Sequence, residues 1–242
     1  MTSFVVVIPA RYASVRLPGK PLRDICGKPM IQHVYERGIE SSALQVVIAT
    51  DDERIADASE KFGATVCMTG DQHRSGSERI AEVCDIMDWR DDQIVVNLQG
   101  DEPSMPAQLI DQCAGLLADP AADIATLASP IASQEDFDNP NVVKAVVDDA
   151  GNALYFSRAP IPHGGMKLAL QHHGIYAYRC AVLRQLVAAA PSELELCERL
   201  EQLRALALGL RIRVATPPVR PGAGVDTEQD LVAAMRAISQ SC

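Results

Sequence analysis

The sequence predicts an α/β fold with three layers, in which helices cover both faces of a mixed, mostly parallel sheet that carries a β-arm insertion. Three observations predict it. Short, continuous apolar runs alternate with helical patterns through the first half of the chain, which is typical of buried parallel strands. Several strand-like segments then follow one another with little helix between them, which indicates an antiparallel extension. At 242 residues and 48% hydrophobic, the chain can bury a full core.

The first half is a regular succession of strands and helices. Apolar, β-branched runs predict the strands, and apolar positions three and four residues apart predict the helices between them. In chain order we expect a strand at 5–8, a helix at 30–40, a strand at 46–49, a helix at 53–62, a strand at 65–67, a helix at 77–87, a strand at 93–98 and a helix at 107–117.

The second half has a different pattern. We expect strands at 124–128, 142–147, 152–157 and 173–178, then a helix at 193–208, a strand at 211–215 and a last helix at 227–238. The middle strands can pair as a hairpin arm at about 130–180, in which residues 159–171 are the most loop-like part. An arm of this kind often supports dimerisation, so we predict a homodimer of one domain that spans residues 1–242.

Composition excludes several classes of protein. The formal net charge of −10 disfavours a nucleic-acid binder, which needs a basic face to release counterions from phosphates. No apolar run reaches the roughly 20 residues of a membrane helix and the start has no signal-peptide pattern, so we expect a cytoplasmic protein without membrane contact. The seven cysteines include no Cys-x-x-Cys pair, which argues against a disulfide framework or a zinc site.

A cationic loop follows the first apolar run. Between residues 4 and 28 there are five Lys/Arg and one Asp, a local charge of +4, and Arg11, Arg16 and Lys20 come directly after the strand. A loop at the carboxyl end of a parallel strand lies over the crevice where such sheets bind ligands, and Arg and Lys are the residues that hold phosphate. The alternative is a set of solvated charges in a loop whose Pro and Gly only make turns. The clustering favours a site for a small anion.

Two acidic residues are candidates for a divalent cation such as Mg²⁺. Asp101 follows the apolar run at 95–98, and Asp226 follows a Gly-rich stretch before the last helix. Mg²⁺ is usually held by one or two carboxylates together with substrate phosphates. Each residue also has an ordinary interpretation, because Asp101 suits a turn and Asp226 suits a helix start. Their assignment as a pair depends on the fold bringing them together.

Three further segments combine polar residues with strand or helix ends. Residues 73–79 precede a helix, whose N-terminus could receive an anion, although Ser75 or Ser77 could equally be a plain helix cap. Arg158 ends one predicted strand, and the tandem histidines at 172 and 173 begin another. The chain contains no dinucleotide-binding, P-loop or serine-hydrolase motif, so an anion site here is of another kind.

Taken in order, these segments resemble the bacterial 3-deoxy-manno-octulosonate cytidylyltransferases, the CMP-Kdo synthetases, over nearly the whole chain. The resemblance implies a nucleotide-diphospho-sugar transferase-like (Rossmann-like) fold and an enzyme that converts CTP and Kdo to CMP-Kdo and pyrophosphate for lipopolysaccharide biosynthesis. The segments that carry it are 8–11 (IPAR), 16–22 (RLPGKPL), 75–79 (SGSER), 99–103 (QGDEP), 153–158 (ALYFSR), 174–176 (GIY), 200–204 (LEQLR) and 224–227 (GVDT).

The resemblance also implies roles for individual residues. Arg11 and Lys20 would hold the triphosphate and offset charge on the leaving pyrophosphate, while Asp101 and Asp226 would carry Mg²⁺. The anomeric hydroxyl of Kdo would attack the α-phosphorus in line, a reaction that depends on positioning and electrostatics. The remaining substrate-binding residues implied in this way are Arg16, Ser75, Gly76, Arg79, Gln99, Arg158, His172, Tyr176, Glu201 and Gln202.

The chain departs from the family pattern near the sugar site. Only nine residues separate Pro162 from His172, where many members have roughly twice as many, and Gln171 stands where a basic residue is common. The same chemistry on 8-amino-8-deoxy-Kdo or on sialic acid is therefore an alternative. A nucleotide-binding module without turnover is another, and the presence of both Asp101 and Asp226 speaks against it.

Overall fold

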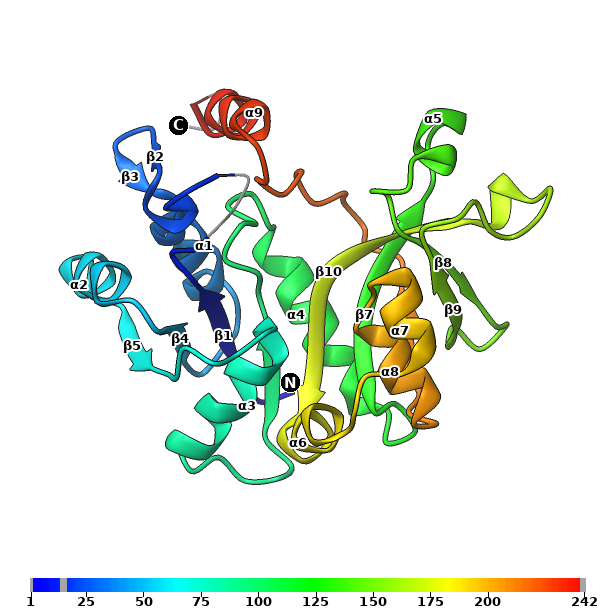
Figure 1. Ribbon diagram of the computed structural model, residues 1–242, viewed down its shortest axis with the longest axis horizontal. Helices are drawn as coiled ribbons and strands as arrows, with labels where there is room; N and C mark the ends of the chain where they lie inside the picture. The colour runs from blue at the N-terminus through cyan, green and yellow to red at the C-terminus, as the bar shows by residue number, and fades with distance from the viewer. Residues whose placement is uncertain (1, 14–16, 240–242) are drawn as a thin grey trace.

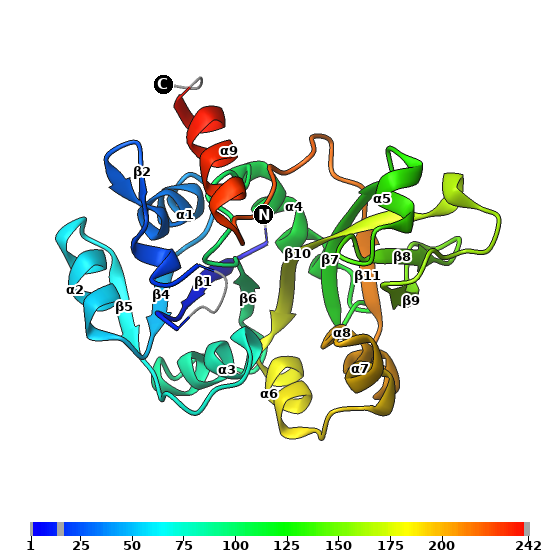
Figure 2. The same cartoon turned by 45° about the horizontal axis from the view of Figure 1, so that its top comes forward.

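A mixed sheet organises the part of the chain that the computed structural model describes, residues 2–13 and 17–239 (Figures 1 and 2). Its main strand order is β11-β7-β10-β6-β1-β4-β5, and only β10 on this path runs antiparallel to its neighbours. The carboxyl ends of the other six strands therefore meet at one edge. The strands are β1 (Phe4–Ala10), β4 (Val46–Thr50), β5 (Thr65–Met68), β6 (Ile94–Asn97), β7 (Ile124–Pro130), β10 (Leu170–Arg179) and β11 (Ile212–Ala215).

Helices cover both faces of this sheet because the strands are apolar on both sides. Val5 and Val7 of β1 face one layer of core and Phe4, Val6 and Ile8 face the other. The first layer is covered by α3 (Gly76–Ile86), α6 (Cys180–Ala188) and α8 (Gln202–Ala207), and the second by α1 (Met30–Ile39), α2 (Glu53–Lys61) and α4 (Ala107–Gly115). None of the helices in the described residues is both long enough and apolar enough to cross a membrane.

An arm projects from the sheet between β7 and β10 (Figure 1). It contains the short helix α5 (Gln134–Asp138), the antiparallel strands β8 (Lys144–Val147) and β9 (Ala153–Ser157), and the 3-10 helix η3 (Met166–Leu168). β8 pairs with the start of β10, so the arm is joined to the sheet by hydrogen bonds. A small apolar cluster of its own stabilises the arm, made by Ile131, Met166, Phe137 and Ala169.

The last helix returns to the beginning of the chain, and Figure 2 shows α9 (Glu228–Ser239) beside β2. Leu231 and Ala234 of α9 pack with Leu17, Ile25 and Met30. This cluster brings the residues before α9 to the loop after β1. The remaining elements of that region are the 3-10 helix η1 (Lys20–Leu22) and the two-stranded ribbon of β2 (Asp24–Ile25) and β3 (Lys28–Pro29); another 3-10 helix, η2 (Leu116–Ala118), follows α4.

The predicted fold class is confirmed, with differences in detail. The expected helix at 193–208 is wrong: it is two helices, α7 (Glu193–Glu198) and α8, because Arg199 adopts a left-handed backbone conformation with φ of 56° and ends α7. The α6 helix was not predicted from the sequence. The expected strand at 173–178 is longer, because β10 begins at Leu170 to pair with both β7 and β8.

Candidate active site

A large cavity lies at the carboxyl edge of the sheet, beyond the ends of β1 and β6. Its volume is about 830 Å³. It brings together eight of the predicted site residues, which come from five separate segments of the chain: Arg11, Lys20, Ser75, Gly76, Arg79, Gln99, Asp101 and Asp226. Loops after parallel strands converge here, as expected for ligand sites in α/β sheets.

Lys20 joins the two predicted metal-binding carboxylates. Its Nζ lies 2.7 Å from Asp101 Oδ2 and 3.0 Å from Asp226 Oδ1. Burial by itself would lower the pKa of Lys20, but the charge and hydrogen bonds of Asp101 and then of Asp226 outweigh it, and the pKa is raised. Lys20 is therefore a cation, held where two negative charges converge.

Local structure directs the Asp226 side chain into this cavity. The Val225 N–H donates to the Asp101 carbonyl oxygen at 2.8 Å, which ties the two acidic segments together. The start of α9 is capped by the residues that follow: Thr227 N–H donates to Asp230 Oδ2 at 2.9 Å, and Asp230 N–H donates back to Thr227 Oγ1 at 3.2 Å. Thr227 is therefore a cap of α9, and the Asp226 carboxylate accepts from Lys20.

Glu102 is the third acidic side chain in this region. Burial, and then the negative charges of Asp101 and Asp226, raise the pKa of Glu102 to about 8. Its carboxyl group lies against the backbone of Gly224, where an added Cβ would stand 3.1 Å from Glu102 Oε1. Near neutral pH this region therefore presents mainly the two charges of the aspartates.

The two aspartates fit a magnesium ion. Their oxygens already converge on one ammonium group, and hard oxygen ligands are those that Mg²⁺ prefers. Within the described ranges, no group of three or more His, Cys, Asp or Glu side chains is arranged to hold a metal. Phosphate oxygens and water would have to complete the coordination, as is usual for Mg²⁺ in phosphoryl-transfer sites.

The opposite end of the large cavity is built around Arg79. This buried side chain donates to Thr69 Oγ1 and lies 3.2 Å from Asp51 Oδ1, so it ties together the ends of β4 and β5. His73 lines the same end, and its Nε2 is paired with Glu82 Oε2. Most polar groups here are already positioned by one another, which makes a preorganised wall.

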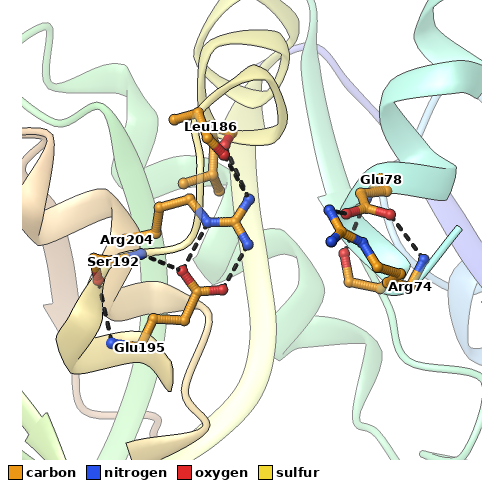
Figure 3. A network of polar contacts seen from close by, with 8 residues as sticks. Arg74, Glu78, Leu186, Ser192, Glu195 and Arg204 are labelled. Atoms are coloured by element: carbon orange, nitrogen blue, oxygen red, sulfur yellow. Dashed lines mark hydrogen bonds and ion pairs between the residues drawn. The ribbon is translucent and has the colours of Figure 1, made fainter. Parts of the chain in front are cut away.

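Between the two ends, α3 begins at the floor of the cavity. Ser75 caps this helix, which is one of the two interpretations that the sequence allowed. Its Oγ accepts a hydrogen bond from the Glu78 N–H at 3.2 Å. Glu78 in turn accepts from the Arg74 N–H at 2.8 Å (Figure 3). Gly76 lies close to β1, since an added Cβ would stand 3.2 Å from Pro9 Cγ.

A second cavity of about 200 Å³ adjoins the first, and Gly76 and Gln99 line both. It lies between the sheet and the α6–α8 layer and includes three more of the predicted residues, Tyr176, Glu201 and Gln202. Its other lining residues are Ser77, Asn97, Ile124, Tyr178, Leu186, Ala205 and Ile212.

A buried ion pair supports the wall of the second cavity (Figure 3). Arg204 donates from Nε to Glu195 Oε2 at 2.8 Å and from a terminal nitrogen to Glu195 Oε1 at 2.5 Å. The same guanidinium also donates to the Leu186 carbonyl oxygen at 3.3 Å, so it links α7, α8 and α6. Two parallel charge-assisted bonds of this kind give a well-defined geometry.

Two predicted site residues lie elsewhere. His172 is packed behind Tyr176, with 5.2 Å between ring centroids, and its Nε2 lies 3.1 Å from Thr126 Oγ1. Arg158 donates from Nε to the Glu198 carbonyl oxygen at 2.8 Å. Neither is among the described residues that line the two cavities. Arg16 lies outside the described residues.

Asn97 was not predicted as a site residue, yet it lines the second cavity and is 2% exposed. Its signal in the sequence is a polar residue at the end of an otherwise apolar strand, directly before Leu98. The adjacent QGDEP segment contains charged residues and was the stronger indication of a site, so Asn97 was not included.

The fold and the joined cavities define a class of protein, the α/β nucleotidyltransferases, because a cationic strand-end loop and two converging carboxylates suit a nucleoside triphosphate. The comparisons with known proteins agree. The model of the Cytidylyltransferase family matches residues 5–212. The chain belongs to the 3-deoxy-manno-octulosonate cytidylyltransferase family, as two curated relatives that bear this name show.

The relative from Yersinia enterocolitica serotype O:8 / biotype 1B is 52% identical over 239 residues, which cover 95% of this chain and 96% of the relative. The relative from Vibrio vulnificus strain YJ016 is 53% identical over 239 residues, with 95% of each chain covered. A solved structure of CMP:2-keto-3-deoxy-manno-octonic acid synthetase complexed with CTP has a TM-score of 0.93 and 43% identity, and the match covers 99% of this chain and 100% of that one. The predicted family and enzyme class are confirmed.

Proposed function

We propose that this enzyme transfers CMP from CTP to Kdo and releases pyrophosphate. The single observation that carries the proposal is the pair of joined cavities: the large one combines Arg11 and Lys20 with two carboxylates, and the small one contains uncharged hydrogen-bonding side chains and shares Gly76 and Gln99 with the large one. A triphosphate with a divalent cation fits the first, and a hydroxylated sugar fits the second. The names of the curated relatives, and the structure with CTP, support the same pair of substrates.

The chain's own residues supply binding and alignment. Arg11 and Lys20 would bind the triphosphate and offset the charge that develops on pyrophosphate as it leaves. Gly76 and Gln99, which line both cavities, would keep the sugar's anomeric hydroxyl next to the α-phosphorus. The new bond forms between that hydroxyl oxygen and the α-phosphorus, the bond to the β-phosphate breaks, and the hydroxyl proton is lost to water.

Asp101 and Asp226 would hold Mg²⁺, which supplies Lewis-acid stabilisation of phosphate charge when it is bound. Because Lys20 donates to both of these carboxylates, its ammonium group would turn toward the phosphates if the carboxylates held a divalent cation. Lys20 would thus exchange two carboxylate contacts for phosphate contacts during substrate binding.

The decisive experiment measures pyrophosphate release with CTP and Mg²⁺ on Kdo, with 8-amino-8-deoxy-Kdo and N-acetylneuraminate as comparison sugars. We expect Kdo to be used alone or best. Asp101→Asn should abolish most of the activity, whereas Asp92→Asn should not, because Asp92 precedes β6 at the other end of the same strand and pairs with Arg90 at the surface. No release with any sugar, or unchanged activity of Asp101→Asn, would contradict the proposal.

We further propose that the enzyme works in the cytoplasm as a homodimer, that it contributes to lipopolysaccharide biosynthesis, and that the arm forms part of the dimer contact. Leu154 and Leu168 of the arm expose 61% and 73% of their surface, which suits burial against a second copy. Sedimentation equilibrium at micromolar concentration should give twice the chain mass, and Leu154→Glu with Leu168→Glu should reduce it to one chain. A single-chain mass for the unmodified protein would refute the dimer.

A further inference from the structure

A polar side chain interrupts an otherwise apolar row across the sheet. Asn97, the last residue of β6, lies opposite Val7 of β1 on one side and Tyr176 of β10 on the other. Val7 and Tyr176 belong to the apolar core on the α3 and α6 face, so the Asn97 side chain points into that same layer. It is 2% exposed, and its Oδ1 is buried without a hydrogen-bond partner among the described residues.

Tyr176 shows the same defect. Its ring is packed between those of His172 and Tyr178, but its hydroxyl group is also buried without a partner in the described part of the chain. Burial raises the pKa of Tyr176 well above its usual value, so the hydroxyl keeps its proton and can donate. Each unsatisfied buried polar group destabilises a protein, because the group loses its hydrogen bonds to water and gains none in return. Leucine at 97 and phenylalanine at 176 would avoid this loss.

Both orphaned groups line the second cavity, and nothing else in its lining satisfies them. A ligand hydroxyl group could satisfy both, because it can donate to Asn97 Oδ1 and accept from the Tyr176 hydroxyl. Binding of the ligand would then give both Asn97 Oδ1 and the Tyr176 hydroxyl the hydrogen-bond partner that they lack among the described residues.

The charge of the second cavity selects the part of the ligand that enters it. Among the described residues that line it there is no Lys, Arg or His, and Glu201 is acidic. Arg11, Lys20 and Arg79 line the first cavity instead. A carboxylate would therefore be repelled from the second cavity and attracted to the first. Neutral hydroxyl groups are the complementary ligand for the second.

The chemistry of a 2-keto sugar acid agrees with this orientation. Its carboxyl carbon is bonded directly to the anomeric carbon, so the carboxylate must stay close to the reacting hydroxyl and hence to the phosphates in the first cavity. The hydroxyl groups farther along the sugar are left to extend past Gly76 and Gln99 into the second cavity.

We propose that Asn97 is a specificity-determining residue, whose Oδ1 accepts a hydrogen bond from a sugar hydroxyl remote from the reacting centre, with the Tyr176 hydroxyl donating to the same oxygen. This inference rests on the proposed function and adds the orientation of the sugar and the residue that recognises its hydroxylated end.

The test compares Asn97→Leu and Tyr176→Phe with Thr126→Val. Thr126 is buried in the same row, next to Tyr176, but its hydroxyl is satisfied by the Ile175 carbonyl oxygen at 2.7 Å and it does not line the cavity. For Asn97→Leu we expect the KM for Kdo to rise at least tenfold, the KM for CTP to stay within twofold, and Tm to be unchanged or higher. Thr126→Val should lower Tm and leave both KM values within twofold.

Kdo analogues that each lack one hydroxyl identify the contact. The unmodified enzyme should discriminate against one of them, and Asn97→Leu should use that analogue and Kdo equally well. An unchanged KM for Kdo in Asn97→Leu, or an equal rise in Thr126→Val, would overturn the inference. If the unmodified enzyme releases no pyrophosphate with Kdo and CTP, the proposed function itself fails, so the two failures are distinguishable.

Discussion

Replacing Lys20 by methionine should weaken turnover but strengthen the binding of a divalent cation to the free enzyme. The Lys20 ammonium lies 2.7 Å from Asp101 and 3.0 Å from Asp226, in the position for which a metal ion held by both carboxylates would compete. Methionine keeps most of the length of the side chain and removes its charge. The variant therefore isolates the electrostatic competition.

The magnitude follows from the exposure of the three side chains. Opposite unit charges about 4 Å apart attract by about 1 kcal/mol in water and about 4 kcal/mol at an effective dielectric constant of 20. Asp101 is 31% exposed and Asp226 is 46% exposed, so the lower part of this range applies, most of all to Asp226. Removing the competing ammonium should therefore tighten binding of the ion by at least about tenfold, which corresponds to about 1.4 kcal/mol.

Titration of the free enzyme with Mn²⁺, followed by electron paramagnetic resonance, measures this affinity directly and requires no turnover. Asp101→Asn in the same background should remove the gain, because one of the two carboxylates is then neutral. A Lys20→Met enzyme that binds Mn²⁺ no more tightly than the unmodified enzyme would refute the reasoning, since the ammonium and the ion would then not compete for the two carboxylates.

Three further predictions concern stability. Burial lowers the pKa of His172 to about 3 and of His173 to about 4, so below about pH 6.5 the unfolded chain binds more protons than the folded protein. The free energy of unfolding should therefore fall as the pH is lowered from 6.5 to 4, by at most about 1.4 kcal/mol per pH unit for each imidazole ring. Urea unfolding should show about half of this pH dependence in His173→Gln. Glu195→Gln leaves Arg204 buried with a weaker partner and should lower the free energy of unfolding by about 3–5 kcal/mol. The double variant with Arg204→Met should recover most of this stability. A loss below about 1 kcal/mol in Glu195→Gln alone would contradict this prediction. Gly100→Ala should lower the free energy of unfolding by about 1–3 kcal/mol in the same assay and should lower activity, because the new Cβ would stand 2.9 Å from a backbone carbonyl oxygen of β1. An unchanged urea midpoint would contradict this and would show that the strand ends can separate.

The sequence predicted the large cavity well because its chemistry is local. Lys20 and Asp101 each follow an apolar strand, and parallel strands present their carboxyl ends at one edge, so the two loops had to meet there. Asp226 was less certain, because a helix start also explains an acidic residue. The structure brings Asp226 close to Lys20 and Asp101 through contacts distant in sequence, the packing of α9 on the first loop and the Val225 bond to Asp101.

The second cavity was harder to predict because its shape depends on non-local geometry. The break at Arg199 turns α8 away from the line of α7, and only the tertiary contact between Arg204 and Glu195 explains why the helical run folds back. In β10 the pairing with β7 shifts between His173 and Tyr176, so no pattern of alternation could show that Tyr176 lines the cavity and that neither of the two histidines does. Asn97 could be recognised as a candidate site residue only from the structure, which shows that its buried Oδ1 has no hydrogen-bond partner among the described residues.

The arm leaves and rejoins the sheet at neighbouring positions, since Pro130 at the end of β7 is paired with Leu170 at the start of β10. The arm is thus an insertion between β7 and β10, two antiparallel strands that would form a hairpin even if the arm were absent. Lengthening or trimming the insertion need not move either strand, and the small apolar cluster within the arm can absorb such changes. The arm can therefore vary in length by insertion and deletion over evolution, while the sheet and the two aspartates at its carboxyl edge keep their places.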